Sequence, residues 1–281
     1  CLNMKQINRR SFLAAAGLTA AALALTACGG SASSTASSTA SSAASSEAAS
    51  TSAAAELTTV EAGKLTMATN AAFPPYEMTT DAGEFEGIDI DTAKAIAEKL
   101  GLELQIDDMD FDAALLSVQQ GKADIVMAGV TVTDERKAVM DFSDSYATGI
   151  QSIIVPNDSD IASPDDLAGK KIGTQRGTTG YIYCSDDFGD ENVVAYDDGL
   201  TAVQALNNGQ VDAVVIDNAP AQEFVAANPG LKVLDTSYAE EDYAIGMAKG
   251  SALEDAVNKA LEELKADGTL QAIVDKYINA N

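Results

Sequence analysis

The stretch VQQGKADIVMAG, residues 118–129, has a counterpart in LNNGQVDAVVID, residues 206–217. Both read amide–amide–Gly–x–x–Asp–x–Val, in which the glycine can end a helix and the apolar residues can form a buried strand. Upstream of each copy, a strand that begins with lysine leads into an irregular loop, in KLTMATNAAFPP from residue 64 and in KKIGTQRGTTG from residue 170. The echo predicts two similar α/β lobes whose strands end at a shared cleft, although two strand–helix units can also be alike by chance.

Short apolar runs alternate with helical patterns along the rest of the chain, as is typical of α/β proteins. Strands are predicted at residues 64–69, 103–107, 123–127, 171–174, 192–196, 211–216, 231–234 and 243–249. Helices are predicted at residues 90–100, 112–120, 133–140, 181–186, 200–207, 220–227, 252–267 and 270–277.

Two further apolar runs, within residues 149–171 and 239–251, look like crossings between the lobes. We therefore expect lobe 1 to comprise residues 57–147 plus 242–281, and lobe 2 to be an insertion of residues 148–241. Two crossings suit a protein that bends at a hinge.

Composition excludes several classes of function. The 281 residues are 46% hydrophobic, which is enough for one or two cores. The net charge of −26 argues against nucleic acid and anionic lipid as partners, because both are bound through Lys and Arg. The chain has no histidine, which rules out a serine–histidine triad, a cysteine–histidine pair and a histidine-ligated zinc. We expect no metal and no cofactor.

Residues 1–27 are typical of an export signal, with a basic start, an apolar run at residues 13–25 and small residues before Cys28. LTAC at residues 25–28 resembles the bacterial lipobox, whose cysteine is lipidated, and RRSFL at residues 9–13 resembles a twin-arginine signal. A spanning helix is the alternative, but the apolar run is shorter than the ~20 residues that a bilayer requires. We expect a lipoprotein at the outer face of the cytoplasmic membrane.

Residues 28–56 are rich in Ser and Ala, a composition typical of a disordered tether. Cys1 precedes Met4, the more plausible start, so processing would leave Cys184 as the free thiol of the mature chain. No disulfide framework is expected.

Arg136 is unusual because it lies in the first turn of a predicted helix, after a probable Thr133 cap. Helix starts favour acids and disfavour cations. An anion bound there would be served by exposed N–H groups and by the guanidinium, which binds a planar carboxylate in a bidentate contact. The alternative is a surface ion pair with Asp134, Asp141 or Asp144.

Other candidates follow predicted strands. Asp217 could face the cleft and bind an ammonium group, and it could also cap the next helix. Thr178 and Thr179, in RGTTG, could offer N–H and hydroxyl groups to an anion or could form a plain helix cap. Phe73 and Phe111 could clamp a ligand or belong to the core.

Five stretches resemble, in order, the polar amino-acid-binding proteins of bacterial ABC importers, the extracellular solute-binding family 3. They are ATNAAFPPYEM, GEFEGIDIDTAKAIAEKLG, GKADIVMAGVTVTDERKAVMDFSDSY, GTTG and GQVDAVVID. The resemblance covers about residues 57–277 and implies a two-lobed, type II periplasmic-binding-protein-like fold with two crossings. It also implies that the lobes close around one free L-amino acid, which is then passed to an ABC importer permease.

By this resemblance, Arg136 would bind the α-carboxylate of the ligand, with help from backbone N–H groups of Thr131 and Thr179. The ammonium group would meet Asp217, the Thr131 hydroxyl and the Gly129 carbonyl. Phe73 and Phe111 would sandwich the ligand side chain. The candidate ligand-binding residues are Asn70, Phe73, Glu77, Phe111, Gly129, Thr131, Arg136, Thr178, Thr179 and Asp217.

The sequence also departs from the pattern of the family. Asn70 stands where several relatives have an acid, which disfavours a basic ligand, although Glu77 and Gln151 could approach its far end. Gly129 stands where some relatives have serine, and Arg176 could favour an acidic ligand. We expect a polar or basic amino acid and a monomeric protein.

Two alternatives remain at this stage. A dehydratase-like enzyme on the same fold would need a general acid or base, for which Glu77 and Asp217 are candidates. A sensor of amino acids would need a separate signalling partner.

Overall fold

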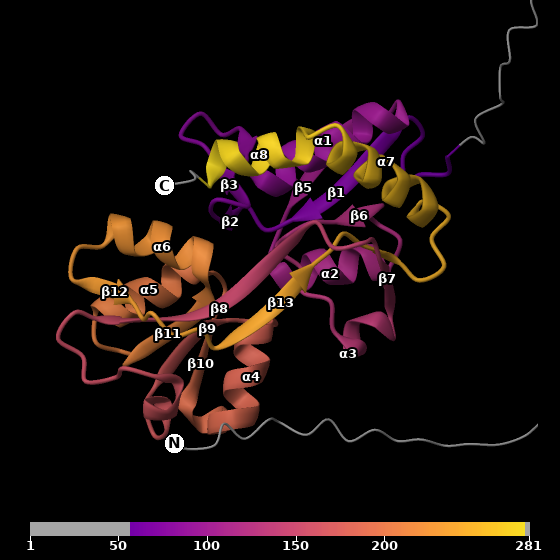
Figure 1. The fold of residues 1–281 in the computed structure, drawn as a ribbon. Helices are drawn as coiled ribbons and strands as arrows, with labels where there is room; N and C mark the ends of the chain where they lie inside the picture. Colours follow the sequence, from indigo (N-terminus) through magenta and orange to yellow (C-terminus); the bar gives the residue numbers. More distant parts are fainter. Residues whose placement is uncertain (1–56, 279–281) are drawn as a thin grey trace, which may run out of the picture. The chain divides into compact units, whose positions relative to one another are not determined.

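A computed structural model describes residues 57–278 (Figure 1). The predicted export signal, Cys28 and the tether, residues 1–56, lie outside the described residues. The described part contains two large β-sheets with helices against them and one small three-stranded sheet. No helix in this part is both long enough and apolar enough to span a bilayer.

The first sheet has five strands in the order β5-β1-β6-β14-β7. Its strands are β1 (Lys64–Thr69), β5 (Glu103–Asp108), β6 (Ile125–Val126), β7 (Met140–Phe142) and β14 (Gly246–Ala248). β1 runs parallel to β5 and β6, whereas β14 is antiparallel to β6 and β7.

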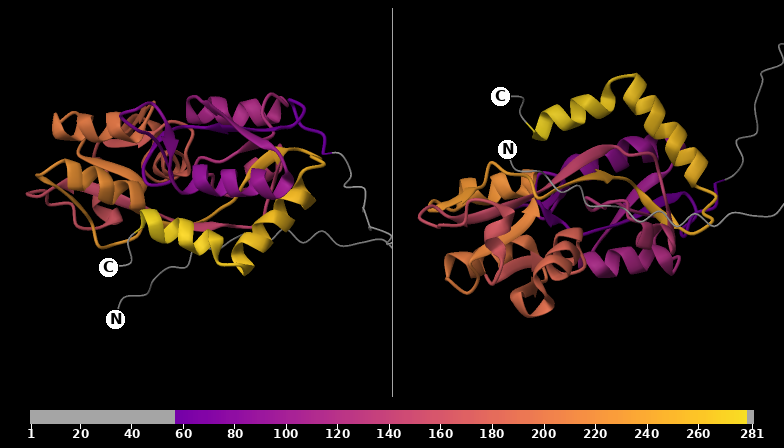
Figure 2. Two further views of the ribbon diagram at one scale, coloured as in Figure 1. Left: turned by 90° about the horizontal axis from the view of Figure 1, so that it is seen from above. Right: turned by 60° about the horizontal axis from the view of Figure 1, so that its bottom comes forward.

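Successive side chains of β1 point to opposite sides of the first sheet. Because apolar β1 side chains are buried on both sides, helices cover both faces of this sheet. Leu65 and Met67 pack in the core that includes residues of α1 and α7, and Ala68 packs with residues of α2. Figure 2 shows the last two helices, in yellow, following one another beside the first part of the chain, where both contact α1. These helices are α1 (Ile88–Leu100), α2 (Phe111–Gln119), α7 (Glu254–Ala266) and α8 (Thr269–Tyr277).

The second sheet has six strands, in the order β10-β9-β11-β8-β12, with β13 also paired to β8. They are β8 (Ala147–Pro156), β9 (Ile172–Gln175), β10 (Val193–Tyr196), β11 (Ala213–Asp217), β12 (Leu231–Val233) and β13 (Ala239–Tyr243). The helices that connect them are α4 (Thr179–Phe188), α5 (Gly199–Asn207) and α6 (Asn218–Ala227).

The two similar sequence stretches belong to the same arrangement of three parallel strands, which occurs once in each large sheet. β1 lies parallel between β5 and β6, and β9 lies parallel between β10 and β11. Gly121 and Gly209 follow α2 and α5 with positive φ angles of 65° and 67°, which glycine adopts readily. The Asp124 carboxylate accepts the Thr66 N–H at 2.8 Å, and the Asp212 carboxylate accepts the Lys171 N–H at 2.7 Å. Each repeated aspartate therefore binds the backbone at the first strand of its unit, β1 or β9.

The chain passes from the first sheet to the second through β8 and returns through β13 (Figure 1). These strands pair with each other antiparallel, from Ala147 opposite Tyr243 to Gln151 opposite Ala239. The sheets thus follow the predicted order of crossings, while the exact lobe boundaries stay a prediction.

Two predicted elements are wrong in part. The helix predicted at residues 133–140 is a single turn, α3 (Asp134–Lys137), and is followed by β7, whose buried Met140 pairs with β14. The strand predicted at residues 243–249 is divided between β13 and β14, because the Ala244 N–H turns to the Val130 carbonyl at 3.1 Å.

The strand predicted at residues 64–69 has these bounds in β1, the other predicted elements occur with shifted ends, and the strand predicted at residues 123–127 is only the short β6. Short elements that were not predicted are β2 (Ala72–Phe73), β3 (Glu77–Thr79), β4 (Phe85–Glu86) and the 3-10 turns Pro164–Leu167 and Asp190–Asn192.

Candidate functional site

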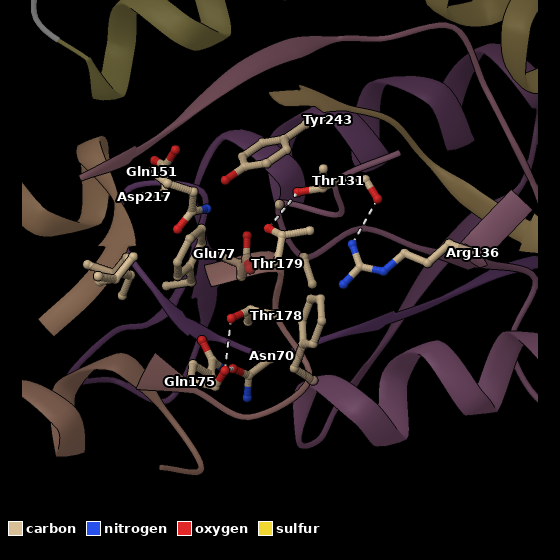
Figure 3. Close-up of a pocket in the computed structure, with 16 residues that line it drawn as sticks. Asn70, Glu77, Thr131, Arg136, Gln151, Gln175, Thr178, Thr179, Asp217 and Tyr243 are labelled. Atoms are coloured by element: carbon tan, nitrogen blue, oxygen red, sulfur yellow. Dashed lines mark hydrogen bonds between the residues drawn. The ribbon is translucent and has the colours of Figure 1, made fainter. Parts of the chain in front are cut away.

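A pocket lies between elements of the two large sheets, and its side chains are drawn in Figure 3. Every candidate residue from the sequence lines it, including Asn70 directly after β1 and Asp217 at the end of β11. The lining residues are Asn70, Phe73, Glu77, Phe111, Ala128, Gly129, Thr131, Arg136, Gln151, Gln175, Thr178, Thr179, Val215, Ile216, Asp217 and Tyr243.

Arg136 is buried, with 9% of its surface exposed, and reaches into the pocket from α3. Its guanidinium donates from Nη1 to the Thr131 carbonyl at 2.8 Å and from Nη2 to the Gly177 carbonyl at 3.1 Å. The guanidinium carbon lies 5.3 Å from the centre of the Phe111 ring, a cation–π distance.

No ion pair of Arg136 occurs among residues 57–278. The alternative of a surface pair is therefore wrong, and Asp141 instead pairs with Lys249. Burial lowers the pKa of Arg136, but a guanidinium stays protonated in proteins. A buried cation without a carboxylate partner marks the place where a bound anion would be stabilised most.

The predicted Thr133 cap exists, but α3 has only four residues and therefore a small macrodipole. The Arg136 N–H donates to the Thr133 hydroxyl at 3.2 Å, so this N–H is already used. The guanidinium is the main anion-binding group of this region, and a contribution of the other N–H groups at the helix start stays a prediction.

Asp217 is 2% exposed and lies across the pocket from Arg136 (Figure 3). Its carboxylate accepts the Ile150 N–H at 2.7 Å and the Ala219 N–H at 3.0 Å, so it does cap α6. Burial raises the pKa of Asp217 to about 6, against the effect of the two N–H donors. At neutral pH the pocket therefore presents an anion opposite a cation, which complements a dipolar ligand.

The threonines have different positions. The Thr131 and Thr179 hydroxyls lie 3.4 Å apart, and Thr131 donates to Glu241 at 3.1 Å. Thr178 caps α4, because its hydroxyl accepts the Tyr181 N–H at 3.4 Å and donates to the Gln175 carbonyl at 2.8 Å. The cap alternative is thus present for Thr178, while Thr179 begins α4 with its backbone N–H at the helix start.

The two phenylalanines are buried and both line the pocket, so core packing and ligand contact are compatible. Gly129 has φ 55°, and a Cβ added to it would lie 2.9 Å from Cε1 of Phe73. Its N–H donates to the Asp89 carboxylate at 3.0 Å. Glycine is required here by both the backbone angle and the approach of Phe73.

Residues 65–280 match the family model of the bacterial extracellular solute-binding proteins, family 3. The chain belongs to this family. It is 33% identical to the L-cystine-binding protein TcyJ of Escherichia coli over 225 residues, which are 79% of this chain and 85% of the relative.

Two solved structures support this assignment to family 3. The arginine-, lysine-, histidine-binding protein ArtJ of Geobacillus stearothermophilus is 34% identical, with a TM-score of 0.74 over 78% of this chain and 96% of that one. An ancestral arginine-binding protein bound to arginine is 43% identical, with a TM-score of 0.74 over 77% of this chain and 99% of that one. The predicted type II periplasmic-binding-protein-like fold is confirmed.

Two buried carboxyl groups belong to this region: Glu77 lines the pocket, and Asp89 accepts the N–H of the lining residue Gly129. Glu77 and Asp89 are 1% and 0% exposed, and Oε2 of Glu77 and Oδ1 of Asp89 have no hydrogen-bond partner among the described residues. Burial and then the neighbouring Asp89 raise the pKa of Glu77 well above its usual range. Burial also raises the pKa of Asp89 to about 6. Glu77 is therefore protonated more readily than an exposed glutamate.

Two amides join the sheets at another edge of the pocket. Gln175 donates from Nε2 to Asn70 Oδ1 at 2.8 Å, and Asn70 donates to the Met109 carbonyl at 3.0 Å. Both amides are thus held in fixed orientations.

Sequence reasoning missed Gln175 and Tyr243 as lining residues and Glu241 behind them. Alignment of the two repeat units could have found Gln175, since β9 ends there and Asn70 follows β1. Glu241 and Tyr243 are buried on one side of β13, an alternation that the acidic run EED concealed. In the described part, no group of three or more His, Cys, Asp or Glu side chains could hold a metal ion.

Proposed function

We propose that this protein captures one free polar or basic L-amino acid and delivers it to the permease of an ABC importer. The observation that carries the proposal is the buried Arg136, without an ion-pair partner among the described residues, opposite the buried Asp217 in one pocket. An amino acid supplies a carboxylate for the first and an ammonium group for the second. Each charge would then be paired when water is excluded.

The remaining contacts of the α-carboxylate and the ammonium group follow from the pocket. The Arg136 N–H groups that do not contact carbonyls would bind the carboxylate, with backbone N–H groups of Thr131 and Thr179 beside them. The Thr131 hydroxyl and the Gly129 carbonyl would join Asp217 around the ammonium group.

The ligand side chain would extend between Phe73 and Phe111 towards the groups at the far edge of the pocket. Those groups include the amides of Asn70 and Gln175 and the carboxyl group of Glu77, whose oxygens can accept hydrogen bonds from a polar or a cationic end. Arginine is bound by the ancestral protein, and glutamine is bound in a second structure of it. We take L-arginine and L-glutamine as the leading candidates.

Capture would proceed by closure of lobe 1, residues 57–147 plus 242–281, on lobe 2, residues 148–241, about β8 and β13. A ligand favours the closed form only through contacts that it makes with both lobes. Arg136 and Asp217 lie on different lobes, so one dipolar ligand satisfies this condition. Export and anchoring through Cys28 would hold the protein, as a monomer, at the membrane that contains the permease.

Isothermal calorimetry against the twenty amino acids and cystine tests the proposal. One of them should bind, and Arg136→Ala or Asp217→Ala should weaken that binding by about 2–5 kcal/mol, because each leaves a buried ligand charge unpaired. Lys137→Ala removes an exposed neighbouring cation and serves as the control. Wild-type affinity in either pocket variant would contradict the role of that residue.

The raised pKa of Glu77 keeps one enzymatic alternative open, since a carboxyl group that stays protonated can act as a general acid. A dehydratase would convert a cyclic acid such as arogenate or prephenate in proportion to protein concentration. Absence of turnover, together with binding of an amino acid, would exclude it.

A further inference from the structure

We propose that Glu241 is a positioning residue that makes the pocket select an α-ammonium group over an α-hydroxyl or α-keto group. This inference rests on the proposed function and adds the group that the pocket distinguishes. Glu241 does not line the pocket itself but acts through two residues that do, Thr131 and Gln151.

Glu241 lies in the middle of β13, the strand by which the chain returns to the first sheet, and only 6% of its surface is exposed. Its Oε2 atom accepts a hydrogen bond from the Thr131 hydroxyl at 3.1 Å and one from Nε2 of Gln151 at 2.9 Å. Thr131 follows β6, whereas Gln151 belongs to β8. One carboxylate therefore holds pocket residues from two elements.

These two bonds use the donor groups of Thr131 and Gln151, so the pocket is left with their acceptor atoms. A carboxylate can only accept, and a hydroxyl has one hydrogen, so Thr131 presents lone pairs to the pocket. The Thr131 and Thr179 hydroxyls lie 3.4 Å apart, and in this contact the Thr179 hydroxyl must then donate to the Thr131 oxygen. The Gln151 amide likewise turns its NH₂ group to Glu241, and its Oε1 atom would lie 2.8 Å from a Cβ added to Gly180. Two groups that could have donated are held as acceptors.

Acceptors on this side of the pocket suit an ammonium group. An ammonium group has three N–H donors and no acceptor, whereas a hydroxyl has a single donor and a keto oxygen has none. A hydroxy or keto acid would set its lone pairs against those of Thr131 and against the Asp217 carboxylate.

The charge of Glu241 works in the same direction. Its Oε1 atom is buried and has no hydrogen-bond partner among the described residues. A buried carboxylate oxygen without a donor is unfavourable, so a cation bound nearby is stabilised by its field. The Glu241 carboxylate also favours the charged form of Arg136 and raises its pKa against the effect of burial, so its field reaches the pocket.

Calorimetry with matched ligand pairs tests this role. The probes are L-arginine and L-glutamine, each beside the acid in which a hydroxyl replaces the α-amino group. Glu241→Gln can turn an NH₂ group towards Thr131, which removes both the charge and the enforced polarity. We expect Glu241→Gln to weaken amino-acid binding by about tenfold or more and to weaken hydroxy-acid binding less. The ratio of the two affinities should therefore decrease.

The matched control is Glu240→Gln, which makes the same change at the exposed neighbouring position and should leave both affinities unchanged. Equal weakening of amino and hydroxy acids by Glu241→Gln would indicate a merely structural role and overturn the inference, as would an unchanged preference. If the wild type binds none of the amino acids, the proposed function fails with it. If Glu241→Gln does not fold, Thr131→Val takes its place and should narrow the preference in the same way.

Discussion

Arg136 and Asp217 are held in place before any ligand arrives. The guanidinium is fixed by the carbonyls of Thr131 and Gly177, and the carboxylate is fixed by the N–H groups of Ile150 and Ala219. A ligand therefore does not have to order these side chains when it binds, which removes part of the entropic penalty of association.

The raised pKa of Asp217 predicts opposite pH dependences for affinity and for stability. Its folded pKa of about 6 lies above its usual value, so the folded protein binds the extra proton more tightly. This contribution to the stability of the ligand-free protein is present below about pH 4 and is lost as the pH rises through about 6. The buried Asp89 acts in the same direction.

Affinity for an amino acid should change the other way, because only ionised Asp217 attracts the ammonium group. Below about pH 6, binding should weaken by at most about tenfold per pH unit, as calorimetry across this range can measure. Asp217→Asn should bind more weakly and lose most of this dependence. If Asp217→Asn kept the wild-type change of affinity with pH, a group other than Asp217 would be responsible for the pH dependence.

Among the elements, the crossing strands β8 and β13 meet at an unusually close contact. A Cβ added to Gly149 would lie 2.4 Å from Cζ of Tyr243, whose ring packs edge-on against Tyr76 at 5.4 Å. Tyr243 is 1% exposed and lines the pocket, so it cannot turn aside into solvent.

Gly149→Ala should therefore lower the free energy of unfolding by about 1–3 kcal/mol through overpacking. It should also weaken ligand binding, because Tyr243 must shift. Thr148→Ala, at the exposed neighbouring position, should change stability by no more than about 0.5 kcal/mol. Denaturant titration of both variants gives the comparison, and equal stabilities would contradict the packing argument.

The two echoed aspartates offer a second comparison of elements. Asp124 is 6% exposed and accepts N–H groups of Val60 and Thr66 at 2.8 Å each, whereas Asp212 is exposed and accepts that of Lys171. Asp124→Ala should destabilise the protein by about 1–3 kcal/mol, since it leaves the buried Thr66 N–H without its acceptor.

Asp212→Ala should destabilise it less, because water can replace the exposed carboxylate. Chemical unfolding measures both effects. A larger decrease in the free energy of unfolding in Asp212→Ala than in Asp124→Ala would show that burial does not decide how much these hydrogen bonds stabilise the protein.

Local pattern predicted the order of the large elements well, because periodicity and the repeat are properties of neighbouring residues. It failed where distant pairing decides the structure: residues 133–140 read as a helix, but Met140 pairs with Ala248, more than a hundred residues away. Six pocket residues, among them Arg136 and Asp217, were predicted from helix starts and strand ends, and the resemblance to a family added Asn70, Glu77, Gly129 and Thr131. Glu241 was not predicted, since its importance depends on Thr131 and Gln151, which only the folded chain brings to it.

At the scale of the whole molecule, few bonds hold the sheets together across the pocket. They join Asn70 to Gln175, Thr131 to Thr179 and to Glu241, and Arg136 to the Gly177 carbonyl. A neutral hydrogen bond contributes only about 0.5–1.5 kcal/mol net, and a bond that involves a charged group contributes about 1.5–3 kcal/mol. A ligand that pairs with both sides can therefore decide between open and closed forms.

The net charge of −26 predicts a salt effect. Screening of the repulsion among acids should raise the free energy of unfolding between about 0.01 M and about 1 M salt. Affinity for glutamine, which has no net charge, should change little, whereas affinity for arginine should fall because screening also reduces its attraction to the acidic protein. Denaturation and calorimetry at the two salt concentrations test this, and a loss of stability with salt would contradict it.

Gly129 constrains the order in which evolution or an engineer can retarget this pocket. Because a side chain there would collide with Phe73, a serine at 129 is accessible only after position 73 has become smaller. The reverse order passes through a strained intermediate. Libraries for a biosensor with altered selectivity should therefore vary Phe73 first and treat Gly129 as a conditional second site, where the Tyr243 ring and the φ of 55° still favour a small residue.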